Sequence, residues 1–306
     1  MYADFLDISQ EVQQALREGK PVVALESVMV ACGLPHPTNL EAGRKCEQIL
    51  RDAGVVPATI AMLGGRIKVG LSDAELEYIG QPGKKIFKSS RLDLPVLAAR
   101  KADAATTVCA TMYAAHLAGI PIMTAGGLGG VHRGAEKTMD ISADLEELAN
   151  TPVMVVCAGP KAILDLGLTL EFLETRGVPV IGYGTEDFPA FYSRKSGHKA
   201  NYGLYAPEDV AAAFRMQRSM QMPQGMVVAV PIPEAYAIDE KEIEAVIVSA
   251  VREAEEQGVG GKDATPFLLA RVSQLTGGES VAANLELCYE NCRAAAEIAK
   301  ALAERG

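Results

Sequence analysis

Residues 153–183 read VMVVCAGPKAILDLGLTLEFLETRGVPVIGY. Two short apolar runs, at residues 153–157 and 178–183, lie on either side of a stretch with helical spacing of apolar residues at 161–176. Short apolar runs of this type are typical of strands buried on both faces of a sheet. The stretch therefore predicts a strand–helix–strand unit and, with it, an α/β layered fold.

The same alternation continues in both directions along the chain. Further strands are predicted at residues 21–25, 59–63, 104–108, 122–124 and 225–230. Further helices are predicted at residues 8–18, 39–53, 111–118, 142–148, 207–220, 240–257 and 280–304, with Asn39 as the cap of the second. Ser72 and Glu75 form the capping box of one more helix. Because no linker or composition break divides the chain, residues 1–306 are expected to form one domain.

Composition excludes several classes of protein. The 29 basic and 39 acidic residues give a net charge of −10, which disfavours binding to nucleic acid or anionic membranes. Aromatic residues make up 5% and tryptophan is absent, so the core must be aliphatic. No apolar run reaches the roughly 20 residues of a membrane span, and residues 1–14 lack the features of a signal peptide. A cytoplasmic protein is expected.

The cysteines are scattered, with no CxxC pair, at Cys32, Cys46, Cys109, Cys157, Cys288 and Cys292. Cys288 and Cys292 are four apart on a predicted helix, which is the spacing of half a metal site. No matching histidine pair lies nearby in the sequence. All six are therefore expected to be reduced thiols of the core.

Two ionisable residues follow predicted strands, where α/β proteins usually bind ligands. Glu26 is either a general acid or base with a raised pKa, or a structural partner for a backbone amide. Lys161 follows a strand and a Gly159 turn and is predicted to begin a helix. The field of that helix, with desolvation, would lower the lysine pKa and provide the neutral amine that a Schiff base needs. The alternative is a solvated lysine on the first turn.

A glycine-rich segment, GGLGGVHRG at residues 126–134, is a second candidate. Four glycines in five positions permit close approach of the backbone to an anionic ligand, and His132 and Arg133 supply donors. The segment matches neither the P-loop nor the dinucleotide fingerprint. The alternative is a flexible lid that binds no ligand.

Two further segments carry charge. Asp140 and Asp144, with Ser142 between them, provide oxygen ligands for Mg²⁺ or Mn²⁺, or else a helix cap. The basic cluster at residues 88–91, which begins with Lys88, would hold a phosphate or form a solvated loop.

Together, these segments resemble the pseudouridine-5′-phosphate glycosidase family, which includes indigoidine synthase A-like proteins. The resemblance covers residues 8 to 302. The motifs are VVALES at 22–27, GGLGGVHRGAE at 126–136, MDISADLEELA at 139–149, VVCAGPKAILDLGLTLEFLET at 155–175 and TGGESVAAN at 276–284.

The resemblance implies a single-domain α/β/α layered fold with a central mixed sheet. It also implies the reversible conversion of pseudouridine 5′-phosphate and water to uracil and ribose 5-phosphate, a divalent metal, typically Mn²⁺, and a homotrimer. In this family pattern Lys161 is the covalent nucleophile, Glu26 the proton donor and Asp140 the metal ligand. The substrate contacts that it implies are Lys88, Val108, Ser142, Ala143, Asp144, His132 and Asn284.

Three departures from the family pattern concern the base. The family usually has a histidine where this chain has Cys32, a threonine at Val28, and a second arginine at Leu92. These changes leave open a C-glycosidase or C-glycosynthase that uses another base or aromatic acceptor with ribose 5-phosphate. A non-catalytic sugar-phosphate sensor is a third reading, although a sensor does not need an imine-forming amine.

Overall fold

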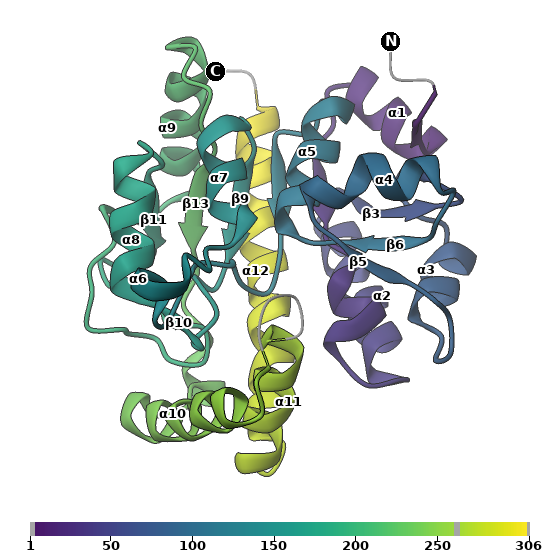
Figure 1. The fold of residues 1–306 in the computed structure, drawn as a ribbon. Coiled ribbons are helices and arrows are strands. Elements are labelled where there is room, and N and C mark those ends of the chain that lie inside the picture. The colour runs from purple at the N-terminus through teal and green to yellow at the C-terminus, as the bar shows by residue number, and fades with distance from the viewer. Residues whose placement is uncertain (1–3, 260–263, 305–306) are drawn as a thin grey trace.

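The computed structural model describes residues 4–259 and 264–304, and a single large sheet forms its centre (Figure 1). The order along the sheet is β1-β4-β3-β2-β7-β9-β13-β11-β12. These strands are β1 (Leu6–Ile8), β2 (Val22–Leu25), β3 (Val56–Leu63), β4 (Arg66–Val69), β7 (Ile122–Thr124), β9 (Met154–Cys157), β11 (Val180–Tyr183), β12 (Tyr202–Leu204) and β13 (Met226–Ala229). Two more strands, β5 (Phe87–Ser89) and β6 (Ala104–Thr106), join it through β3.

The sheet is mixed, as the resemblance implies. The strands from β3 through β2, β7, β9, β13 and β11 to β12 pair in parallel. In contrast, β3 pairs antiparallel with both β4 and β6. The parallel part therefore places the carboxyl ends of β2, β7 and β9 at one edge of the sheet.

Helices cover both faces of the sheet. Alternate residues of β2 enter different cores: Val22 and Ala24 one, Val23 and Leu25 the other. The first core is covered by α1 (Gln10–Arg17), α4 (Leu94–Ala99), α5 (Val108–Ala118), α7 (Ala143–Asn150) and α8 (Leu166–Thr175). The second is covered by α2 (Thr38–Asp52), α9 (Pro207–Ser219), α10 (Glu240–Glu256), α11 (Ala264–Leu275) and α12 (Glu279–Ala303). The predicted α/β/α layering is confirmed.

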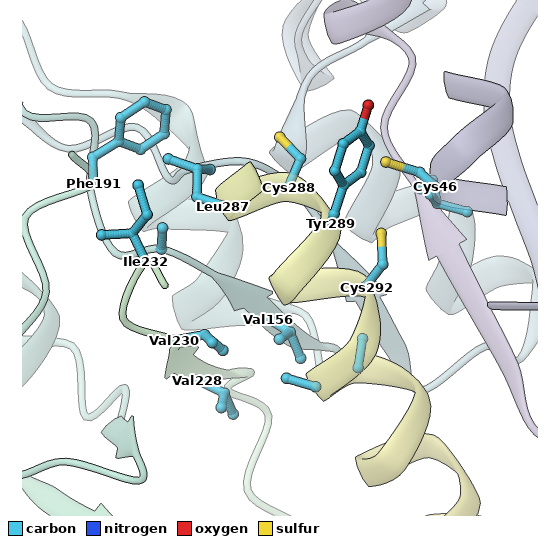
Figure 2. Packing of buried hydrophobic residues seen from close by; sticks show 14 of the residues in the cluster. Cys46, Val156, Phe191, Val228, Val230, Ile232, Leu287, Cys288, Tyr289 and Cys292 are labelled. Atoms are coloured by element: carbon cyan, nitrogen blue, oxygen red, sulfur yellow. The ribbon is translucent and has the colours of Figure 1, made fainter. Parts of the chain in front are cut away.

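The long helix α12 connects the core to one end of the molecule. It packs against α2, α9, β7 and β9, and α11 and α10 lie beside its first turns (Figure 1). Figure 2 shows Cys288 and Cys292 on α12 among the aliphatic side chains, with Cys46 of α2 close by. Of the helices in the described ranges, none has the length and apolar character needed to cross a membrane.

Local signals are confirmed where they depend on near neighbours. Ser72 and Glu75 form the predicted capping box of α3 (Asp73–Gly80). Asn39 is wrongly predicted as a cap: it lies inside α2, and its amide donates to Val30 O and Gly80 O at 2.6 and 2.9 Å. Five cysteines are buried free thiols, but Cys32 is exposed, so its assignment to the core is also wrong.

Two predicted boundaries near the site are shifted. The strand predicted to run to residue 108 ends at Thr106, and Val108 instead begins α5. The helix predicted to begin at Lys161 begins at Leu166, where the Asp165 side chain accepts a hydrogen bond from Leu168 N. Between Lys161 and this helix, β10 (Leu164–Asp165) pairs with β8 (Val131–His132). This pairing holds the chain extended and delays the helix.

Candidate active site

A cavity of about 830 Å³ opens at the carboxyl ends of β2, β7 and β9. Its lining includes residues of the loops after these strands, of η1 (Met29–Gly33), and of α5, α7, α11 and α12. Every residue predicted for the site lines it, namely Glu26, Lys88, Val108, His132, Asp140, Ser142, Ala143, Asp144, Lys161 and Asn284. The structure thus brings into one cavity residues that are up to 258 positions apart in the sequence.

Glu26 directly follows β2 and is largely withdrawn from solvent. Loss of hydration raises the pKa of its carboxyl to about 7. The cations of Lys161 and Lys88 oppose this rise, whereas the Asp144 carboxylate adds to it. No hydrogen bond or ion pair to the Glu26 side chain is found in the described part of the chain. A carboxyl of this kind can both give and take a proton near neutral pH.

Lys161 lies in the loop after β9 and is placed by the glycine-rich segment. Its Nζ donates to Gly127 O at 3.1 Å, and its backbone N–H donates to Leu128 O at 3.0 Å. Because α8 begins at Leu166, the expected field of a helix N-terminus is absent at this lysine. Lys88 also lines the cavity, and its pKa is lowered by burial and by the Lys161 charge.

The glycines of residues 126–130 are required by neighbouring side chains of the protein itself. A Cβ at Gly126 would lie 2.9 Å from Cys288 Sγ, and one at Gly127 would lie 2.5 Å from the Phe191 ring. Cβ atoms at Gly129 and Gly130 would collide with Ser142 and Thr169. The segment is therefore packed closely between other elements, which argues against the alternative of a flexible lid.

Asp144, in the first turn of α7, connects two parts of the site. Its carboxylate accepts from Cys109 N, in α5, and from Gly129 N, each at 2.9 Å. Ser142 caps α7 by accepting from Asp144 N at 3.2 Å, as predicted. Both Asp144 oxygens are thus bound to the backbone, and Asp144 holds the glycine-rich segment against α5.

The two arginines of the predicted basic segments do not line the cavity. Arg91 pairs with the buried Glu147, with NH1 2.9 Å from Oε2. Arg133 pairs with Glu244 of α10 at 2.6 Å. Each arginine is therefore paired with a carboxylate outside the cavity lining. Lys88 and Lys161 remain as the lysines of the cavity lining.

Part of the cavity lining was not predicted from the sequence. Phe191 and Tyr192 line the cavity although neither was predicted as a site residue. The helix α11 adds Thr265, Ser273 and Gln274 to the lining. Asn291, a buried residue of α12 that contacts the loop after β7, was also missed. The segment between β11 and β12 brings residues 191–192 to the cavity, and the packing of α11 and α12 against the strand ends brings the others close to it.

Comparison with known proteins identifies the family of this chain. A family model described as indigoidine synthase A like protein matches residues 11–301. The chain belongs to the indigoidine synthase A-like family. The match extends over the whole sheet from β2 onward and over the loops that carry Glu26, Lys161 and Asp140.

Relatives in this family are similar over nearly their whole length. A protein of Clostridium botulinum, named pseudouridine-5′-phosphate glycosidase, is 53% identical over 299 residues, which are 98% of this chain and 97% of that protein. An Escherichia coli protein of the same name is 53% identical over 297 residues, or 97% of this chain and 95% of that protein.

Solved structures in the family have the same fold. The prealnumycin C-glycosynthase AlnA, in complex with ribulose 5-phosphate, has a TM-score of 0.90 and 36% identity, and the match covers 98% of this chain and 97% of that one. An indigoidine synthase A-like protein from Thermotoga maritima has a TM-score of 0.89 and 35% identity, with the same coverage.

The three departures from the family motifs all line the cavity. Val28, Cys32 and Leu92 are among its lining residues. Although the Cys32 residue is exposed overall, partial desolvation of its thiol raises the thiol pKa, with the Lys88 charge opposing the rise and the Glu26 charge adding to it. Cys32 therefore shares the cavity with Glu26 and Lys88 and interacts with both charges.

Proposed function

We propose that this chain is a pseudouridine-5′-phosphate glycosidase that reversibly converts pseudouridine 5′-phosphate and water to uracil and ribose 5-phosphate. One observation carries the proposal. The Glu26 carboxyl, with a pKa of about 7, and the Lys161 amine, which donates to Gly127 O, line the same cavity. The names of the close relatives support the reaction, and the ribulose 5-phosphate bound to the C-glycosynthase supports a sugar-phosphate substrate.

The bond to be broken explains why an amine is needed. It joins C1′ of the ribose to carbon 5 of uracil, and carbon is a poor leaving group for the oxocarbenium route of ordinary glycosidases. An imine at C1′ would provide an electron sink, because the nitrogen lone pair can replace the electrons that leave with the base.

The proposed steps use only Glu26, Lys161 and water. Glu26 protonates the ring oxygen while the lone pair of Lys161 Nζ bonds to C1′ and the ring opens. The Glu26 carboxylate then takes the proton that the new ammonium loses. The bond from C1′ to carbon 5 breaks, its electron pair and the proton on Glu26 go to carbon 5, and uracil leaves. Water hydrolyses the remaining iminium to ribose 5-phosphate and returns the amine and the Glu26 proton.

The phosphate would be bound by the basic and helix-terminal part of the cavity lining. Lys88 and the amino end of α5, which begins at Val108, both line it. A helix N-terminus and an ammonium group are suitable partners for a phosphate.

Uracil release is the direct test of the function. Uracil formation from pseudouridine 5′-phosphate, followed by ultraviolet absorbance, is expected for the purified chain, with about 100-fold lower kcat/KM for unphosphorylated pseudouridine because the phosphate contacts with Lys88 and with the amino end of α5 are lost together. Each charge-assisted hydrogen bond contributes about 1.5–3 kcal/mol, which is roughly tenfold or more. Absence of uracil formation from pseudouridine 5′-phosphate, both with and without added divalent metal, would contradict the proposal.

Asp140 fits a divalent metal that is held mainly by water and substrate. Its side chain borders the cavity, and no partner for its carboxylate is found among the described residues, whereas Asp144 is already bound to two amides. No cluster of three or more metal-binding side chains occurs in those residues. Mn²⁺ or Mg²⁺ commonly binds through one carboxylate and several waters. When bound, such an ion would orient the ribose phosphate by charge.

Asp140→Asn is expected to remove the metal requirement and most of the activity together. The variant should have an about 100-fold lower kcat/KM, because a substrate that the metal no longer orients is displaced from the reactive geometry. Titration with Mn²⁺ followed by calorimetry should show binding to wild type and none to the variant, while the melting temperature without metal stays the same. Equal Mn²⁺ affinity in both proteins would show that Asp140 is not the ligand.

A C-glycosynthase is the second candidate function, and three residues of the cavity lining favour it. Val28, Cys32 and Leu92 replace more polar family residues on the lining. Incubation of ribose 5-phosphate with uracil and, separately, with aromatic acceptors distinguishes the two. Faster coupling to an aromatic acceptor would support the synthase.

The homotrimer and the cytoplasmic location implied by the resemblance remain part of the proposal. Leu92, two residues before α4, and Val96 of α4 are exposed apolar residues, with 69% and 51% of their surface accessible. They provide a surface on which subunits can pack.

A further inference from the structure

We propose that Asn291, which no comparison assigns to the site, is the positioning residue of the nucleophile: it fixes the glycine backbone on which the Lys161 amine rests. The inference rests on the proposed function, because it gives Lys161 the role of nucleophile. Asn291 lies on α12, is fully buried, and is not part of the cavity lining. It therefore acts through another group and has no contact with the substrate.

The contacts of Asn291 lead directly to the amine. Its Nδ2 donates to Ala125 O at 2.9 Å and to Gly126 O at 3.1 Å. The next carbonyl along the chain, Gly127 O, accepts from Lys161 Nζ at 3.1 Å. One amide group thus holds the two peptide units before the carbonyl that places the nucleophile.

The backbone at this point depends on such contacts because Gly126 and Gly127 have no side chains. Gly126 O also accepts from Ala158 N, and Leu128 N donates to Gly159 O, each at 3.0 Å. These bonds connect the glycine-rich segment to the loop that carries Lys161. Asn291 attaches the connected pair of loops to α12, so that both move with the helix.

The side-chain oxygen of Asn291 shows that the hydrogen bonding of this buried residue is incomplete. Its Oδ1 is buried and has no hydrogen-bond partner among the described residues. Burying an unpaired carbonyl is unfavourable. Only an NH₂ group can donate to two successive carbonyls from one short side chain. The arrangement is therefore explained by a need for those two donors at that point.

The chain contains a matched control. Asn39 is also buried, its Nδ2 also donates to two backbone carbonyls, Val30 O and Gly80 O, and its Oδ1 is also unpaired. Its partners lie in η1 and α3, not in the two loops that hold Lys161. Asn39→Ala and Asn291→Ala therefore remove the same interactions from a buried site, but only the second frees the two peptide units that precede the Gly127 carbonyl.

The experiment measures how fast Lys161 forms an imine. Wild type, Asn291→Ala and Asn39→Ala are mixed with ribose 5-phosphate and quenched with borohydride at increasing times, and the fraction of covalently labelled protein is read by mass spectrometry. Thermal melts set a temperature at which all three are folded. Asn291→Ala is expected to label about 100-fold more slowly, which is the effect of a displacement near 1 Å. Its kcat should fall by the same factor, with KM within threefold of wild type.

Asn39→Ala is expected to label within threefold of the wild-type rate. Asn291→Ser, which keeps one donor, is expected to lie between wild type and the alanine variant, and it decides the question if Asn291→Ala does not fold. Equal labelling rates for wild type and the folded Asn291 variant, or an equal loss in the Asn39 variant, would overturn the inference. If wild type itself is not labelled and releases no uracil, it is the proposed function that fails.

Discussion

Lys161→Ala is expected to abolish covalent trapping by borohydride and to lower uracil release by about four to six orders of magnitude, the loss typical of removing a catalytic nucleophile. The reason is that the imine at C1′ cannot form without the Nζ that Gly127 O holds in the cavity. The measurement is mass spectrometry of protein treated with ribose 5-phosphate and borohydride, together with the ultraviolet assay for uracil.

Two further variants define what the loss means. Lys161→Arg keeps a cation near Glu26 but not a nucleophilic amine, and it should be as inactive as the alanine variant. Lys137→Ala removes an exposed lysine of α6 (Ala135–Thr138), close to the glycine-rich segment in the chain, and should retain full activity and labelling. Trapping of ribose 5-phosphate by Lys161→Ala at the wild-type rate would assign the imine to another lysine.

Glu26→Gln is expected to lower kcat by about 1000-fold, within the usual range for loss of a general acid or base. In wild type, kcat/KM should decline as the pH rises through about 7, because the Glu26 carboxyl that must donate a proton then loses it. The variant should lack this decline. Glu136→Gln, at an exposed carboxylate of α6, serves as the control and should keep the wild-type profile.

The same substitution should stabilise the protein at high pH. Folding raises the pKa of Glu26 from 4.5 to about 7, so its contribution to stability is fully present below pH 4.5 and is lost as the pH rises through 7. Above pH 8 this amounts to a penalty of up to about 3 kcal/mol, since each pKa unit corresponds to 1.36 kcal/mol. Glutamine cannot ionise and avoids the penalty. Denaturant unfolding at pH 6 and 8 should therefore show a gain for Glu26→Gln that grows with pH; a gain independent of pH would refute the raised pKa.

The sequence predicts the parts of the site that follow strands. Glu26 comes directly after an apolar run and Lys161 follows another after a short turn, and the parallel order of β2, β7 and β9 then places both at one edge of the sheet. The position of the helix after Lys161 could not be predicted in this way. Its start is set by the pairing of β10 with β8, a contact between segments that are more than thirty residues apart.

The glycine-rich segment shows a second limit of the sequence. The glycines of residues 126–130 predict that another group comes close to the backbone, but they do not predict which group it is. In the folded chain the approaching groups are Cys288, Phe191, Ser142 and Thr169, which are brought together only by tertiary packing. Asn291 was missed for the same reason, since an asparagine within an apolar helix face has no local signature of its function.

The close packing around Gly126–Gly130 also indicates where directed evolution of this enzyme should begin. Libraries at those glycines would yield mostly misfolded clones, because any added side chain meets occupied space. Val28, Cys32 and Leu92, together with the α11 residues Leu269 and Ala270, border the cavity without holding the nucleophile. Saturation of these five positions is the economical route to variants that accept unnatural aglycones.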